Sequence, residues 1–307
     1  MIRFGLCCLF RNEPVKFRTF NATSVLKIEK RARIRKISGI CLENCESLQF
    51  ALRAVDRMGI GAFRICSGLF PVSTHPEAGY FIDDLPDSVK IKKTLEGCRK
   101  FAAEKNIRLS FHPDQFIVLS SPHEKVVANS AKDLECHGMI ADLLDADVIN
   151  IHLGGRYDSK KDAIERFRRN FEKLSEKVRN RIRLENDDVS YTPEDLYPIC
   201  SELKVPLVYD VHHHRCNPDG SSVKDASDLC IETWKARKAE PYFHISSPKN
   251  GWNQKDKKSH SDYIDPEDFP DCWLNLKTDF TLDVEAKAKE LAVLKLMAEV
   301  QCAAKVR

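Results

Sequence analysis

The 307-residue sequence lacks the features of a membrane or exported protein. It contains no run of about 18 apolar residues, so we expect no membrane-spanning helix. The first residues, MIRFGLCCLF, include no long apolar stretch, and charged residues follow closely. This pattern favours a buried first strand over a signal peptide. We therefore expect a cytoplasmic protein without membrane contact.

Nucleotide-binding and metal-binding cysteine motifs are also missing. No GxGxxG follows any predicted strand, so a dinucleotide-binding fold has no support. The 12 cysteines are scattered and form no CxxC motif. They are expected to be reduced thiols that pack as small hydrophobic residues. The net charge is only +3, so any argument for nucleic-acid binding depends on local basic patches.

What the sequence does contain is a regular alternation of short β-branched segments with helix-like segments. Eight strands are expected, at 2–8, 62–67, 107–112, 148–153, 182–187, 206–211, 242–246 and 280–286. Such alternation favours parallel strands joined by right-handed crossovers, and eight strands close a (β/α)₈ TIM barrel. An open, doubly wound sheet would show the same alternation and is the alternative. We predict one barrel domain over residues 1–307.

Two connections between predicted strands are unusually long and basic. They cover about residues 9–42 and 248–279, and we expect both to be loops at the C-terminal ends of strands. The first contains KIEKRARIRK (27–36) and the second contains KNGWNQKDKK (249–258). A single charged run usually just faces water. Two basic runs near one rim favour a surface that binds phosphates.

Ligand-type side chains recur where the predicted strands end. Six successive strands carry an imidazole or a carboxylate there, namely His112, His152, Glu185, Asp210, His244 and Glu285. A barrel brings these ends to one face, where barrel active sites lie. Burying such groups unpaired would cost several kcal/mol each, and bound metal ions remove that cost. We therefore predict a metal site at the C-terminal face.

The types of ligand indicate which ions and which chemistry to expect. Imidazoles and carboxylates together suit Zn²⁺, Mn²⁺ or Fe. No cysteine is found among these strand-end residues, which favours a catalytic over a structural site. The predicted ligands exceed the needs of one ion, and Glu185 and Glu285 could each bridge two. Clustered ions can act on both the attacking and the leaving oxygen of a phosphoester.

Several motifs in this order resemble the UV damage endonuclease (UVDE) family, whose members are related to endonuclease IV. The similar stretches are FRICSGLFPVSTHP, SFHPDQF, INIHLGG, RLEND, DVHHHRCNP, HIS followed by HSDY, and DVEAKAKE. The resemblance implies an enzyme that nicks DNA immediately 5′ to UV photoproducts and leaves a 3′-hydroxyl and a 5′-phosphate. It also implies divalent metals, often manganese, with these ligands: His75, His112, His152, Glu185, Asp210, His213, His244, His260 and Glu285.

The same resemblance suggests residues that contact the lesion, with some departures from the family pattern. Gln115 and Phe116 stand where the family has a Gln–Tyr pair that probes the duplex. Leu6 stands where relatives can carry a tyrosine near the lesion, and Arg156 is a further expected DNA contact. Tyr242 stands where relatives have a lysine near the metals.

The working hypothesis is a monomeric enzyme that hydrolyses a phosphodiester of damaged double-stranded DNA. Two or three divalent ions, Mn²⁺ first and Zn²⁺ or Mg²⁺ as alternatives, would be held with Glu185, Asp210 and Glu285 as the catalytic carboxylates. An abasic-site endonuclease of the endonuclease IV type is the nearest alternative. A metal-dependent sugar isomerase and a non-enzymatic binding module are more distant ones.

Overall fold

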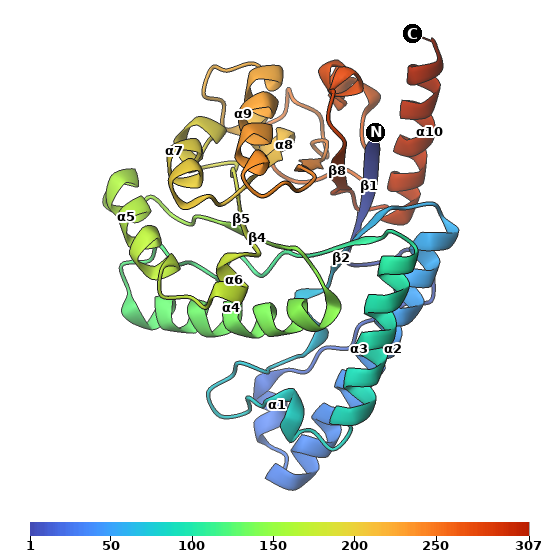
Figure 1. The fold of residues 1–307 in the computed structure, drawn as a ribbon, viewed down its shortest axis with the longest axis vertical. Coiled ribbons are helices and arrows are strands. Elements are labelled where there is room, and N and C mark those ends of the chain that lie inside the picture. The colour runs from blue at the N-terminus through green and yellow to red at the C-terminus, as the bar shows by residue number, and fades with distance from the viewer. Residues whose placement is uncertain (307) are drawn as a thin grey trace.

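Eight parallel strands form a closed barrel, with each strand paired to its neighbours in sequence order (Figure 1). The computed structural model describes residues 1–306. The strands are β1 (Ile2–Cys7), β2 (Ala62–Ile65), β3 (Arg108–Phe111), β4 (Val148–His152), β5 (Ile182–Glu185), β6 (Leu207–Asp210), β7 (Tyr242–Ile245) and β8 (Phe280–Val284). All eight predicted strands are confirmed, and the open sheet is excluded because β1 pairs with β8 from Ile2↔Phe280 to Leu6↔Val284.

Helices lie outside the barrel and cover the outer face of the strands. They are α1 (Ala22–Leu26), α2 (Lys30–Arg57), α3 (Ser88–Glu104), α4 (Glu124–Leu144), α5 (Lys160–Phe171), α6 (Glu176–Arg179), α7 (Pro193–Leu203), α8 (Val211–Cys216), α9 (Val223–Lys235) and α10 (Glu290–Val306). Every residue of β2, β5, β6, β7 and β8 is buried. Both faces are buried because the helices cover the outside and side chains of the strands fill the inside, so polar strand residues such as Asn150 and His244 are buried as well. No helix among residues 1–306 is long and apolar enough to cross a membrane.

The connection after β7 contains no α-helix within the described chain, in line with its weak helical periodicity. Two 3₁₀ turns, η3 (Pro266–Asp268) and η4 (Asp271–Asn275), are its regular elements. The expectation of a loop over residues 9–42 is wrong for its second half, because α2 begins at Lys30. The Glu29 carboxylate accepts hydrogen bonds from the first backbone amides of α2, and Ile37 and Cys41 are buried one helical turn apart.

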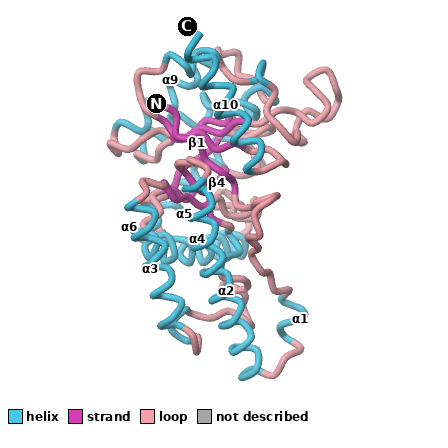
Figure 2. Tube along the Cα trace, turned by 90° about the vertical axis from the view of Figure 1, so that its right-hand side faces the viewer, coloured by secondary structure: helices cyan, strands magenta, loops and turns pink. Residues whose placement is uncertain are grey.

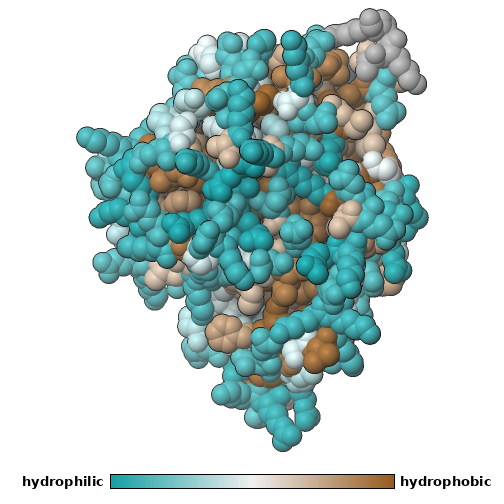
Figure 3. All heavy atoms as spheres, viewed as in Figure 1, coloured by the Kyte–Doolittle hydropathy of each residue, from teal (hydrophilic) through white to brown (hydrophobic). Residues whose placement is uncertain are grey.

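The basic run 27–36, which we call the basic arm, therefore joins α1 to the first two turns of α2. Figures 1 and 2 show α1 and the start of α2 extending well away from the strands. In the space-filling view the tip of this projection is hydrophilic (Figure 3). Residues 30–36 of the arm are thus helical, where the sequence predicts a loop.

Strand register brings candidate ligands together at the C-terminal ends of the strands, a face that we call the mouth of the barrel. His152 of β4 pairs with Glu185 of β5, and Asp210 of β6 pairs with His244 of β7. Residues paired across parallel strands are neighbours in the ladder. Groups that are far apart in sequence are therefore adjacent at the mouth.

Candidate metal centre

Glu185 lies at the centre of the mouth, and imidazole nitrogens surround its carboxylate. His112 Nε2 lies 3.1 Å and His152 Nε2 3.9 Å from Oε2. On the other side, Nδ1 of His213 and Nδ1 of His244 each lie 3.2 Å from Oε1. The side chain of Glu185 is fully buried, so its charge is shielded from water and interacts mainly with these four rings.

Glu185 belongs to two groups of potential metal ligands. One comprises His112, His152 and Glu185, and the other comprises Glu185, Asp210 and His213. The ligand atoms within each group lie within 4.8 Å of one another. A carboxylate shared between two such groups is suited to bridge two cations, since each of its oxygens can bind a different ion.

A short helix explains how the run VYDVHHHR delivers two ligands to one place. Helix α8 begins directly after β6, and Asp210 caps it by accepting a hydrogen bond from the His213 backbone amide at 2.7 Å. Residues three apart on a helical turn lie on the same side. His213 Nδ1 accordingly lies 3.6 Å from Asp210 Oδ2.

His212 and His214, the other two histidines of this run, have different surroundings. The His214 ring contacts the Tyr209 hydroxyl at 2.8 Å and Asp219 at 2.9 Å, which accounts for both of its nitrogens. The His212 ring is buried beside Trp252 and His260, with ring centroids 5.1 and 5.3 Å away. His214 therefore has a structural role, and His212 packs against Trp252 and His260.

Glu285 extends the cluster toward the long connection after β7. Its Oε1 lies 3.4 Å from His244 Nδ1 and its Oε2 lies 3.7 Å from His260 Nδ1. His260 reaches this position because the backbone around it is fixed: the Ser259 carbonyl accepts from the Lys249 amide, and the Ser261 amide donates to the Ser247 carbonyl. The loop is thereby anchored by backbone hydrogen bonds on both sides of His260.

The electrostatics of the metal-free site match its geometry. Burial would raise the pKa of Glu185, but His244 and His152, with hydrogen bonds from His112 and His213, hold it well below its ordinary value. Burial would lower the pKa of His244, yet Glu185 raises it to about 9. The pKa of His213 is likewise raised well above its ordinary value by Asp210 and Glu185, against the effect of burial. Protons on His213 and His244 therefore offset part of the carboxylate charge when no metal is bound.

Some buried polar atoms at the mouth lack hydrogen bonds, which fits a site built for cations. Asp210 Oδ2 and His152 Nδ1 are buried without a hydrogen-bond partner among residues 1–306. An unsatisfied buried carboxylate oxygen is costly unless it binds a cation. Imidazoles and carboxylates are the donors that Mn²⁺ and Zn²⁺ accept. The residues present therefore fit divalent metal ions.

Comparison with known proteins agrees with this arrangement. The model of the family described as UV-endonuclease UvdE matches residues 2–307. The UV DNA damage endonuclease of Bacillus mycoides (strain KBAB4) is 34% identical over 312 residues, which cover 97% of this chain and 94% of that protein. The chain belongs to the UvdE family. Its membership rests on the whole length of the barrel and not on one motif.

Solved structures place the UvdE fold in a wider context. The crystal structure of SacUVDE superimposes with a TM-score of 0.85 and 27% identity, and the match covers 100% of this chain and 99% of that chain. Endonuclease IV from Thermus thermophilus superimposes with a TM-score of 0.58 and 16% identity over 98% of this chain and 99% of its own. The second likeness shows a shared fold and nothing more.

Eight of the nine ligands expected from the UvdE resemblance converge at the mouth. They are His112, His152, Glu185, Asp210, His213, His244, His260 and Glu285. The ninth, His75, belongs to neither ligand group within the described residues, and its Nδ1 accepts backbone hydrogen bonds from Glu77 and Ala78. Its role as a ligand stays a prediction.

Three of the four residues expected to contact damaged DNA occupy exposed loops beside the mouth. Gln115 and Phe116 lie in the turn after β3, and the Phe116 side chain is 76% exposed. This turn is held near the loop after β4, because the Ser120 hydroxyl donates to the Leu153 carbonyl at 2.7 Å. Arg156 lies exposed in the second loop. All three side chains are accessible to a large ligand.

Leu6 is a correction to the expected DNA contacts. Its side chain is fully buried in β1, between Phe63 of β2 and Val284 of β8 in the strand register. Contact between Leu6 and a duplex would require the barrel wall to open. The sequence comparison placed the residue near the lesion, but burial in the strand removes it from the surface.

Sequence reasoning missed the polar groups that orient the cluster. Asn150 donates a hydrogen bond to Glu185. Asn186 accepts from the Asp210 amide and donates to the Asp210 carbonyl, both at 2.9 Å. The motif VINIH offered a signal, since alternation in a strand places Asn150 and His152 on one face. Such outer contacts hold metal-binding side chains in place.

Arg64 was also missed, and it is a buried cation at the mouth. It forms ion pairs with Asp283, at 3.1 Å, and with Glu285. The Tyr242 hydroxyl donates to the same Asp283 at 2.9 Å and contacts Ser110 at 3.0 Å. Gly5 leaves room for this carboxylate, because a Cβ there would collide with Asp283. The phenol of Tyr242 therefore belongs to a hydrogen-bonded layer beneath His244.

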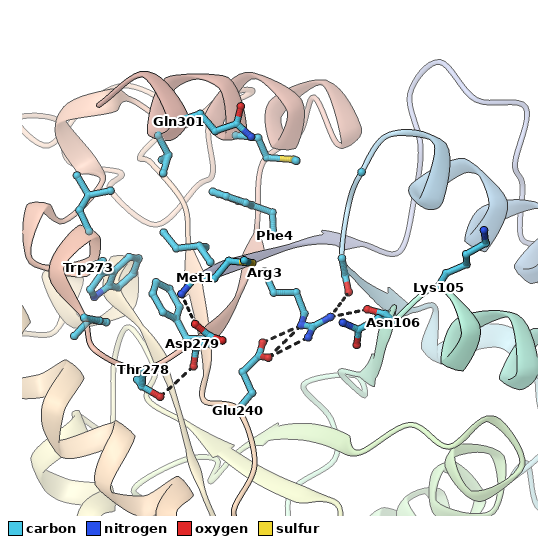
Figure 4. Close-up of a pocket in the computed structure, with 18 residues that line it drawn as sticks. Met1, Arg3, Phe4, Lys105, Asn106, Glu240, Trp273, Thr278, Asp279 and Gln301 are labelled. Atoms are coloured by element: carbon cyan, nitrogen blue, oxygen red, sulfur yellow. Dashed lines mark hydrogen bonds and ion pairs between the residues drawn. The ribbon is translucent and has the colours of Figure 1, made fainter. Parts of the chain in front are cut away.

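A cavity of about 640 Å³ lies away from the mouth (Figure 4). Arg3 and Phe280, at the N-terminal ends of their strands, line it, and it contains none of the candidate ligands. Arg3 is paired with Glu240 at 2.9 Å, as the dashed lines show. The pairing neutralises this arginine, and the cavity is not the candidate active site.

Proposed function

We propose that this UvdE-family protein is a metal-dependent DNA repair endonuclease. It would hydrolyse one phosphodiester of double-stranded DNA immediately 5′ to a UV photoproduct and leave a 3′-hydroxyl and a 5′-phosphate. The relative from Bacillus mycoides bears the name UV DNA damage endonuclease. The observation that carries the proposal for this chain is the buried carboxylate of Glu185, shared between two ligand groups at the mouth.

The two ligand groups support two divalent ions that would share Glu185, and Glu285 with His260 would be the ligands of a third. Mn²⁺ is our first choice, and Zn²⁺ and Mg²⁺ are the alternatives. When bound, such ions supply Lewis-acid stabilisation of the phosphate and lower the pKa of water. Glu185 and Asp210 are fully buried and would hold the ions, whereas the partly exposed Glu285 could also reach the substrate.

The turn after β3 supports recognition of a distorted duplex. Phe116 can stack on a base where the lesion has opened the helix, and Gln115 can fill the space opposite. Separating bases costs less where damage has already weakened stacking. Damaged and undamaged DNA would thus differ in the cost of opening, without any need to read the sequence.

Basic surfaces support binding of the phosphates that flank the lesion. The basic arm carries six cationic side chains, and none of them forms an ion pair within residues 1–306; they are Lys27, Lys30, Arg31, Arg33, Arg35 and Lys36. Arg156 adds a cation beside the mouth. We propose a monomer that acts on DNA in the cytoplasm, since one mouth suffices for one incision.

A nicking assay tests the proposal. Duplexes that carry a cyclobutane dimer, a 6-4 photoproduct or an abasic site are incubated with protein that has been chelated and reloaded with Mn²⁺, Zn²⁺ or Mg²⁺. We expect incision 5′ to both photoproducts and a nick with a 3′-hydroxyl that primes polymerase. Incision of the abasic site alone would favour the endonuclease IV type of activity, and incision without any metal would contradict the role of the cluster.

A further inference from the structure

A second cavity, of about 370 Å³, opens at the mouth directly beside Glu285. Its lining includes Arg64, His260, Lys287 and Lys289 together with Glu285 itself. Because Glu285 also faces His244 at 3.4 Å, the cavity and the candidate metal centre share one carboxylate. A ligand in the cavity would therefore lie next to any group bound at the metal centre.

Two of these cations are not neutralised by the protein. Arg64 is paired with Asp283 and Glu285, but neither Lys287 nor Lys289 forms an ion pair within the part of the chain that the structure describes. Lys287 is exposed and Lys289 is partly buried. Arg64, Asp283 and Glu285 together carry one net negative charge, so the two lysines leave the cavity with a net positive charge.

The backbone that carries the two lysines is fixed by the neighbouring loop. The Lys287 amide donates to the Ser261 carbonyl at 3.0 Å, and the Ala288 amide donates to the Asp262 carbonyl at 2.9 Å. Lys289 has a φ of +56°, which turns the chain sharply before α10. The two lysines are therefore attached to a backbone turn that is already ordered, so binding a ligand requires no further loss of backbone entropy.

The start of α10 is tied to the segment after β1 as well. Glu290 is buried, and its carboxylate accepts hydrogen bonds from the backbone amides of Arg11 and Asn12, at 2.7 and 2.6 Å. The turn at Lys289 is therefore fixed on two sides, by residues 261–262 and by residues 11–12. A cationic turn that is already ordered in this way can bind an anion at one defined position.

We propose that this cavity is a phosphate-binding subsite, in which Lys287 and Lys289 hold the DNA backbone phosphate adjacent to the scissile one. The proposal rests on the proposed function, since it assigns the adjacent phosphate relative to the metal centre. Lysine binds phosphate as a point charge without a fixed geometry. The pair would fix the register of the strand, so that the bond 5′ to the lesion meets the metal centre.

The salt dependence of binding tests the subsite without incision. The full chain is chelated with EDTA, and its dissociation constant for a photoproduct duplex is measured by fluorescence anisotropy from 50 to 300 mM NaCl. The Lys287→Ala/Lys289→Ala double variant should lower the slope of log K against log [salt] by about 0.9, the value for one phosphate contact. The control is Lys100→Ala on α3, where Lys100 pairs with Glu96. An unchanged slope in the double variant would overturn the proposal.

Neutral phosphate analogues locate the contact. Each phosphate within three nucleotides of the incision point is replaced in turn by a methylphosphonate, and binding is measured again. We expect one position adjacent to the scissile phosphate to weaken binding of the wild type and of the control, and to have no effect on the double variant. If every position affects the double variant as it affects the wild type, the lysines do not hold a backbone phosphate.

The two proposals fail in different ways. Suppose that the wild type does not incise photoproduct duplexes, but that the double variant shows the weaker salt dependence and no longer responds to the methylphosphonate. The phosphate subsite then stands and the proposed activity is wrong. If the wild type incises as proposed, and the double variant has the salt dependence and the methylphosphonate response of the wild type, the activity stands and the subsite is wrong.

Discussion

Replacing Glu185 with glutamine removes one charge from the centre of the mouth with little change in shape. The carboxylate faces four imidazoles, three of them at 3.1 to 3.2 Å, and accepts a hydrogen bond from Asn150. In glutamine one of the two accepting oxygens becomes an amide group that can only donate. The substitution thus affects both ligand groups, because Glu185 belongs to both.

The expected magnitude follows from these distances. Two unit charges 3.2 Å apart interact by about 5 kcal/mol at an effective dielectric constant of about 20, before desolvation is considered. Removing one partner of a buried pair typically costs about 3–5 kcal/mol. We expect the metal-free Glu185→Gln variant to lose about 3 kcal/mol of unfolding free energy at pH 7, at the low end because repulsion from Asp210 and Glu285 is relieved.

Metal binding should suffer more than folding. Loss of an outer contact to a metal ligand typically costs about 10–100-fold in metal affinity, so loss of a shared ligand should exceed about 100-fold. Incision of a photoproduct duplex should then fall below about 1% of the wild-type rate at equal Mn²⁺. Urea denaturation, calorimetric Mn²⁺ titration and the nicking assay measure the three effects.

An exposed glutamate provides the matched control for this experiment. Glu232 on α9 pairs with Lys235 at the surface, so Glu232→Gln should leave stability, metal binding and incision unchanged. Full incision by a folded Glu185→Gln variant, or Mn²⁺ affinity equal to that of the wild type, would refute the assignment of Glu185 to a catalytic metal centre.

Three further predictions concern the expected DNA contact Phe116, the hydrogen-bonded layer beneath His244, and the pH dependence of stability. Phe116→Ala should slow incision of photoproduct duplexes about 5–150-fold, which corresponds to a loss of about 1–3 kcal/mol in transition-state stabilisation. Its Tm should not change because the ring is exposed, and a large loss of Tm would contradict the role of Phe116 as a DNA contact. Gly5→Ala should displace the Asp283 carboxylate and cost about 1–3 kcal/mol in urea denaturation, whereas Gly39→Ala, where a Cβ meets nothing, should not destabilise. In the metal-free protein the pKa of His244 is raised from 6.5 to about 9, so its contribution to stability is complete below pH 6.5 and is lost as the pH rises through about 9; a Tm that rises over this interval in EDTA would contradict the assignment.

The barrel and the convergence of most candidate ligands could be predicted from the sequence for a simple reason. Parallel strands that alternate with helices leave few topologies, and the residue that ends each strand must lie at the same face of a closed barrel. His112, His152 and Glu185 follow this rule, and the structure brings them within reach of one another. The helical start of α2 was missed because its first turns are mostly charged and resemble a loop.

Leu6 is a residue whose exposure could not be predicted from the sequence. Position within a motif does not specify exposure, and only the packing of β1 between β2 and β8 shows that this side chain is enclosed. Arg64 is the opposite case. Nothing in FRICSG distinguishes a surface arginine from a buried one, until Asp283 and Glu285 are found beside it.

The sequence by itself determined the order of the strands, the chemical types of the ligands and the face at which they meet, because these depend on local periodicity and on strand ends. The tertiary structure alone decided which carboxylate is shared by two ligand groups, which histidine of the run 212–214 turns inward, and which lysines border a cavity. These features depend on distances between segments that are up to about 280 residues apart, such as the backbone amide of Arg11 and the carboxylate of Glu290. Such distances are fixed only when the barrel closes and its loops pack on one another.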